Sequence, residues 1–79
     1  MKYIDIFLEA LSAEKGRSEK TLTSYESDLR LADAAISGGL LNADTNALQS
    51  YLSHLPDKPS SIARKASALR GFYKFLMLE

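Results

Sequence analysis

Apolar residues recur three and four positions apart through most of this chain, which is the spacing of a helix with one buried face. Near the start, Ile4, Phe7, Leu8 and Leu11 follow that order and predict the first helix. No segment alternates apolar and β-branched residues with polar ones as a strand does, and valine is absent from the sequence. The pattern therefore predicts an all-α protein.

Two strong breakers, Gly38-Gly39 and the run from Pro56 to Pro59, divide the rest of the chain. Ser18 is a good N-cap before the second helix, and the glycine pair supplies the positive φ that often follows a helix C-terminus. Asp44 or Thr45 caps a short third helix, which Pro56 ends. Four helices with short connections imply a compact bundle. The predicted helices cover residues 3–14, 19–37, 45–54 and 60–78.

The buried side of each later helix follows from the 100° step between residues. Tyr25 falls in the apolar sector of the second helix, so its ring is expected in the core with its hydroxyl bonded at the edge. Asp28 is expected to be a structural acceptor. The predicted inward residues are Leu22, Tyr25, Leu29, Ala32 and Ile36 in the second helix, Leu48, Tyr51, Leu52 and Leu55 in the third, and Ile62, Ala66, Leu69, Phe72, Tyr73 and Leu76 in the fourth.

The length of 79 residues allows one domain, and the absence of cysteine excludes disulfides and zinc-thiolate sites, so helix packing must stabilise the chain. The longest apolar runs fall short of a membrane span, and Asp5 and Glu9 interrupt the apolar N-terminal segment. We therefore expect neither a signal peptide nor a membrane partner, and a cytoplasmic location.

Net charge is zero, but its distribution is uneven. Residues 1–57 carry five basic and nine acidic side chains, whereas residues 58–79 carry five basic and one acidic side chain, which makes the two parts −4 and +4. Arg64, Ser67, Arg70 and Lys74 follow one side of the predicted fourth helix for about 15 Å at 1.5 Å per residue, enough to cross a major groove about 12 Å wide. The same spacing also fits an ordinary solvated face.

Two further features belong to that helix. Ser60 and Ser61 add hydroxyls and free backbone N–H groups at its N-terminus, where the helix dipole attracts phosphate. Gly71 interrupts the outward face at a cost of about 1 kcal/mol relative to alanine, which indicates a close approach by another group, such as a second helix.

Residues that could support catalysis or metal binding do not converge. The acidic sets Glu9 with Glu14, and Glu26 with Asp28 and Asp33, consist of successive pairs two or five positions apart that do not share a helix face, so paired-carboxylate catalysis is not expected. His54 is the only histidine, whereas a zinc site needs three or four ligands, so it is expected to lie on the surface near a helix C-terminus. No nucleotide-binding glycine motif is present. The sequence predicts no catalytic residue, metal or cofactor.

Two patterns, taken in order, resemble a known family. Residues 18–29 read S-x-x-T-x-x-x-Y-x-x-D-L, and residues 61–76 read S-x-x-R-x-x-S-A-L-R-x-F-Y-x-F-L. Both are similar to patterns of the N-terminal core-binding domain of phage-integrase or Xer-type tyrosine recombinases, as is the opening run from Ile4 to Leu11. The resemblance covers nearly all 79 residues.

The resemblance implies a SAM-like four-helix bundle that clamps one face of a core-site DNA duplex through its second and fourth helices. It also implies that the catalytic residues belong to a C-terminal domain that is absent here, so that this chain is a non-catalytic part of a recombinase. The implied partners are double-stranded DNA, that catalytic domain and other recombinase protomers. The implied DNA-binding residues are Thr21, Ser24, Ser60, Ser61, Arg64, Lys65, Ser67, Arg70 and Lys74.

A helical adaptor that binds other proteins is the alternative function. SAM-like bundles also serve as adaptors, the charge is balanced, and Leu31, Leu41 and Phe75 are expected to be exposed. Exposed apolar side chains of this kind would dock a protein partner.

Overall fold

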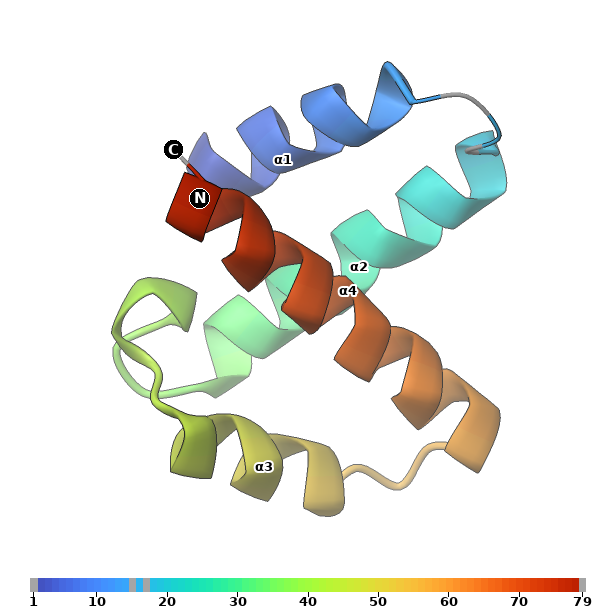
Figure 1. Ribbon diagram of the computed structural model, residues 1–79. Helices are drawn as coiled ribbons and strands as arrows, with labels where there is room; N and C mark the ends of the chain where they lie inside the picture. The colour runs from blue at the N-terminus through green and yellow to red at the C-terminus, as the bar shows by residue number, and fades with distance from the viewer. Residues whose placement is uncertain (1, 15, 17, 79) are drawn as a thin grey trace.

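The computed structural model describes residues 2–14, 16 and 18–78, and these form four α-helices and one short 3-10 helix (Figure 1). No strand occurs among the described residues, so the predicted all-α class is confirmed. The Cα radius of gyration is 12.1 Å. The elements are α1 (Lys2–Ser12), α2 (Glu19–Ala35), η1 (Leu40–Asn42), α3 (Thr45–Ser53) and α4 (Pro59–Leu78).

Helix α4 forms the centre of the arrangement. It crosses α2 (Figure 1), and its C-terminal half packs on α1, where the ring of Phe75 lies against that of Phe7. Helices α1 and α2 pack against each other, and α4 packs against both. Helix α3 lies at the side of the bundle and packs on α4. No helix in the described part of the chain is long and apolar enough to cross a membrane.

Two helix ends differ from the sequence prediction by two residues. Helix α1 ends at Ser12, whose hydroxyl donates to the Glu9 carbonyl at 2.7 Å and so competes with a further helical turn. Helix α2 ends at Ala35, because Ile36 adopts an extended conformation that keeps its side chain buried. Gly38 and Gly39 then have positive φ, as predicted.

The connection after α2 contains η1, which the sequence did not predict. Asp33 accepts a hydrogen bond from the Leu40 backbone N–H at 2.9 Å, and the Leu40 side chain is fully buried. Helices α3 and α4 differ from the prediction by one residue each: α3 ends at Ser53, and α4 begins at Pro59, where proline lacks only an N–H that would have no helical partner.

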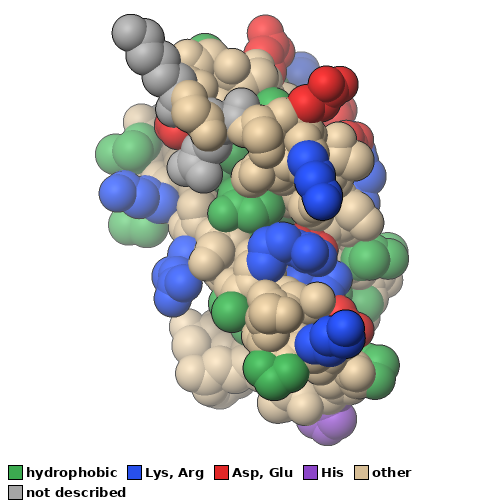
Figure 2. Space-filling model, turned by 90° about the vertical axis from the view of Figure 1, so that its right-hand side faces the viewer, with side chains coloured by type: hydrophobic (Ala, Val, Ile, Leu, Met, Phe, Trp, Pro, Cys, Tyr) green, Lys and Arg blue, Asp and Glu red, His purple; other side chains and the backbone are tan. Residues whose placement is uncertain are grey.

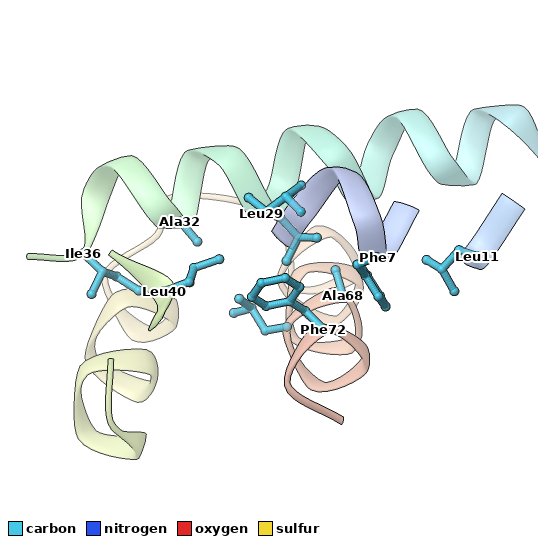
Figure 3. Packing of buried hydrophobic residues seen from close by; sticks show 10 residues of the cluster. Phe7, Leu11, Leu29, Ala32, Ile36, Leu40, Ala68 and Phe72 are labelled. Atoms are coloured by element: carbon cyan, nitrogen blue, oxygen red, sulfur yellow. The ribbon is translucent and has the colours of Figure 1, made fainter. Parts of the chain in front are cut away.

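The core is formed by α1, α2, η1 and α4. The Phe72 side chain is fully buried, and Leu29, Ala32 and Leu40 point toward the space that it fills (Figure 3). Its ring meets that of Phe7 edge to face at a centroid distance of 5.6 Å. The buried apolar residues are Ile4, Phe7, Leu11, Leu29, Ala32, Ile36, Leu40, Ala68, Leu69 and Phe72.

Two expectations for α4 were wrong. Phe75 is partly buried, because its ring packs against Phe7 at a centroid distance of 5.5 Å. Gly71 faces α1 instead of solvent, and a Cβ atom there would lie 3.3 Å from Cζ of Phe7. The close approach inferred from Gly71 is therefore made by a neighbouring helix. Leu31 and Leu41 are exposed as predicted, at 55% and 52%.

Candidate nucleic-acid interface

An ion pair joins α2 and α4, the two helices for which the family resemblance implies contact with DNA. The Arg64 guanidinium on α4 donates from Nε to Oδ2 of Asp28 at 2.8 Å and from Nη2 to Oδ1 at 3.0 Å. The Asp28 side chain on α2 is 2% exposed, whereas that of Arg64 is 44% exposed. This two-bond geometry fixes both position and orientation of the guanidinium, because its planar fork matches the carboxylate. Asp28 is thus a structural acceptor, as predicted.

Lys65, on the buried side of α4, is a second cation that binds the Asp28 carboxylate. Its ammonium donates to Oδ1 of Asp28 at 3.0 Å and lies 3.6 Å from Oδ2 of Asp57, and its side chain is only 8% exposed. A buried charge is tolerated when it is paired and hydrogen-bonded in this way. The position of Lys65 argues against the DNA contact expected for it, since its charged end points into the domain.

The pKa of Asp28 reflects both influences. Burial alone would raise it, but hydrogen bonds from Arg64 and Lys65, together with their positive charges, outweigh burial and hold the pKa below its usual value. The same carboxylate raises the pKa of Arg64. Asp28 therefore remains an anion at neutral pH and keeps both cations in place.

The remaining cations of α4 lie on an exposed ridge. Arg70 and Lys74 are exposed, Ser67 is partly exposed, and Arg70 donates from Nη2 to the Ser67 hydroxyl at 3.4 Å. Ser60 is exposed and Ser61 is partly exposed at the helix start. Figure 2 shows one face of the molecule, with Lys and Arg side chains in its middle and at its left edge and much of the acidic surface toward its upper right edge.

Two hollows border this ridge. One, of about 320 Å³, lies between α1 and α4 and is lined in part by Ser67 and Lys74. The other, of about 950 Å³, lies between α3 and α4 and is lined in part by Arg70 and Lys74. The ridge is thus flanked by a hollow on each side, and each hollow has an acidic residue in its lining, Glu14 in the first and Asp44 in the second.

Helix α2 contributes a smaller polar surface. Thr21 is partly exposed, its N–H donates to the Ser18 hydroxyl at 3.1 Å, and its own hydroxyl lies 2.9 Å from the same oxygen. This hydrogen bonding confirms Ser18 as the N-cap. Ser24 is partly exposed one turn further along.

The helix caps and the lone histidine behave as the sequence indicated. Asp44 is the N-cap of α3 and accepts from the Ala47 N–H at 2.8 Å. His54 is exposed, and its Nδ1 donates to the Ser50 carbonyl at the C-terminal end of α3 at 2.7 Å. Within the described residues, no group of three or more His, Cys, Asp or Glu side chains could hold a metal ion.

Sequence reasoning missed the link between Asp28, Lys65 and Asp57. One signal was available for Lys65: it precedes Leu69 and Phe72 by four and seven positions, so the helical spacing places it on their buried side. No local sequence pattern indicated that Asp28 is the partner of Lys65, because the two residues are 37 positions apart.

Comparison with known proteins gives a family match and several relatives. Residues 4–79 match the family described as phage integrase, N-terminal SAM-like domain. The tyrosine recombinase XerD of Rhizobium meliloti (strain 1021) is 49% identical over 83 aligned positions, which cover 98% of this chain and 27% of that protein. The tyrosine recombinase XerC of Erythrobacter litoralis is 46% identical, with 96% of this chain and 25% of that protein covered.

A XerD from Pseudomonas putida is 42% identical, with 96% of this chain and 28% of that protein covered. The chain thus spans about a quarter of the length of these relatives. No solved structure matches it.

Proposed function

Because the chain belongs to the family of phage-integrase N-terminal SAM-like domains, we propose that it is a DNA-binding domain of a site-specific tyrosine recombinase. In this proposal it clamps one face of a core-site duplex through α4 and α2. The parent protein's catalytic residues then belong to a C-terminal domain, with which this domain and other protomers assemble on double-stranded DNA.

The exposed ridge of α4 is the observation that carries the proposal. Helix α4 contains four basic residues and no acidic ones, and three of the four, Arg64, Arg70 and Lys74, are exposed. Phosphate neutralisation by such side chains supplies most of the sequence-independent affinity of proteins for DNA. From Arg64 to Lys74 the helix rises about 15 Å at 1.5 Å per residue, which is enough to cross a major groove about 12 Å wide.

The structure changes the set of contact residues that we propose. Lys65 is removed, because its ammonium is bound to buried Asp28. The others stay in the proposal because each is at least partly exposed. The proposed contacts are Ser60, Ser61, Arg64, Ser67, Arg70 and Lys74 from α4 and Thr21 and Ser24 from α2.

Titration of a fluorescein-labelled duplex at several salt concentrations tests this proposal. We expect weak binding, with Kd on the order of 10⁻⁴ to 10⁻⁶ M, that decreases steeply as salt rises. Replacing both Arg70 and Lys74 by alanine removes two cations whose carbon stems contribute little to the core. Each lost phosphate contact should lower the slope of log K against log salt by about 0.9.

Arg30→Gln is a control that removes one positive charge from another surface, to be compared with Arg70→Ala alone. Arg30 lies on α2 and donates to Glu26 at 3.0 Å and to Asp5 on α1, so it belongs to another surface network. It should retain the wild-type salt dependence more closely than Arg70→Ala, which removes the same charge from α4. The proposal is wrong if the folded domain shows no binding at low salt.

A second candidate is supported by the exposure of Leu31 and Leu41, which lie on α2 and η1 outside the core. We propose that these two exposed side chains dock a protein, as in an adaptor. Chemical-shift changes confined to these two residues on adding a protein partner, together with absent DNA binding, would favour that function.

A further inference from the structure

Toward the described residues, the Arg64 guanidinium donates hydrogen bonds from one of its edges, to Asp28. Arginine has five N–H donors in a fixed plane. Nε and one N–H of Nη2 point to Asp28. The end of the plane, formed by Nη1 and the other N–H of Nη2, is a second edge with two parallel donors. The side chain as a whole is 44% exposed, and no hydrogen bond from Nη1 to a described residue is found.

The Asp28 carboxylate fixes the orientation of the Arg64 guanidinium. It is almost fully buried on α2 and accepts hydrogen bonds from both Arg64 and Lys65. Asp28 therefore has little freedom to turn away. A guanidinium anchored in this way loses less side-chain entropy when it binds a second partner than a free surface arginine does.

The charges of the cluster indicate how it would act. Arg64 and Lys65 are balanced by Asp28 and Asp57, so the four residues together are neutral. Such a cluster adds little long-range attraction for a polyanion. Its value lies in orienting two donors at short range, where a bidentate acceptor gains both energy and geometric selectivity.

We propose that Asp28 and Lys65 are positioning residues that present the Nη1–Nη2 edge of Arg64 to one bidentate acceptor on the duplex. This inference rests on the proposed DNA-binding function. Two acceptors share the required chemistry: the oxygens of a backbone phosphate, and O6 with N7 of a guanine in the major groove.

A double-mutant cycle on DNA affinity tests the positioning role. In the wild-type background, Arg64→Ala should weaken binding about tenfold or more. In an Asp28→Asn background, where the guanidinium loses its ionised anchor, the same change should cost less than about threefold. Glu26→Gln is the control, because it removes one negative charge from the same helix without touching Arg64; in that background the tenfold cost should persist.

The duplex composition identifies the acceptor. An equal cost of Arg64→Ala on A·T-only and G·C-containing duplexes indicates a phosphate, whereas a cost confined to the G·C-containing duplex indicates guanine. An equal cost of Arg64→Ala in the wild-type and Asp28→Asn backgrounds overturns the positioning role but leaves DNA binding intact. Failure of the wild-type domain to bind any duplex overturns the proposed function itself.

A measurement on the wild-type protein covers the case in which Asp28→Asn does not fold. The Nε–H of Arg64 should exchange slowly with water both before and after duplex is added, because its bond to Asp28 persists in the complex. An increase in its exchange rate upon binding would show that Arg64 leaves Asp28 to reach DNA, and would falsify the positioning role.

Discussion

Gly71 of α4 lies directly against Phe7 of α1, so that a methyl group at position 71 would come within 3.3 Å of the Phe7 ring. This contact brings the backbone of α4 close to α1 at the level of the aromatic cluster. The Phe7 ring is buried, and it packs against Phe72 and Phe75. It therefore has little room to move aside.

Gly71→Ala should consequently destabilise the domain, although the same change in an open helix position stabilises by about 1 kcal/mol. Overpacking of a filled core costs about 1–3 kcal/mol, so we expect a net loss of about 1 kcal/mol in urea denaturation. Ala63→Gly, at an exposed position of the same helix, should cost about 1 kcal/mol from helix propensity alone. A Gly71→Ala variant more stable than wild type would contradict the packing described.

Phe72→Ala should reduce the free energy of unfolding by about 3–5 kcal/mol, because it leaves a cavity at the centre of the core. A small domain has only about 5–15 kcal/mol in total, so the variant should melt at much lower temperature or be largely unfolded. Met77→Ala, on the same helix at an 85% exposed position, should leave the melting curve nearly unchanged. Circular dichroism on heating checks both, and equal effects would argue against this core.

Tyr73→Phe should cost about 1 kcal/mol in urea denaturation. The Tyr73 hydroxyl donates to the Leu40 carbonyl at 2.7 Å, and this bond ties α4 to η1 across a partly buried contact. Tyr3→Phe removes a hydroxyl from a more exposed ring and should have almost no effect. If the two changes cost the same, the bond to Leu40 contributes nothing measurable.

Asp28→Asn should change how stability depends on pH. The folded-state pKa of Asp28 is below its unfolded value of about 3.9, so its contribution is present above about pH 4 and is lost as pH falls through the folded pKa. At neutral pH the substitution leaves the buried Lys65 ammonium without its closest carboxylate, at a cost of about 3 kcal/mol.

Urea denaturation of both proteins between about pH 7 and pH 2 should show the difference shrinking at the acidic end. A difference that stays constant over this range would mean that Asp28 is not ionised in the folded protein.

Most of the fold could be predicted from sequence, because local signals specify it. Helical periodicity gave the four helices, and the caps at Ser18 and Asp44 have the predicted hydrogen bonds. The segment around η1 could not be predicted in this way. Its conformation depends on Leu40 reaching the core and on Asp33 capping its N–H, and neither is visible as a periodic pattern.

The candidate site was predicted less completely. Helical spacing correctly predicted that Arg70 and Lys74 are exposed, because both fall on the side of α4 opposite its apolar residues. Lys65 was expected to contact DNA because of its charge. Its position in the helix, however, places it on the buried side of α4. The partnership of Arg64 with Asp28 depends on how α2 and α4 cross, which is a tertiary relationship that neither segment encodes alone.

The peripheral position of α3 has a consequence for how the domain opens. None of its residues is fully buried, in contrast to the three helices that enclose Phe72. Local opening costs least where few apolar contacts must be broken. The amide hydrogens of α3 should therefore exchange with deuterium before those at the centres of α2 and α4. The domain would then behave as two cooperative units, a slowly exchanging three-helix core and a faster-exchanging side helix.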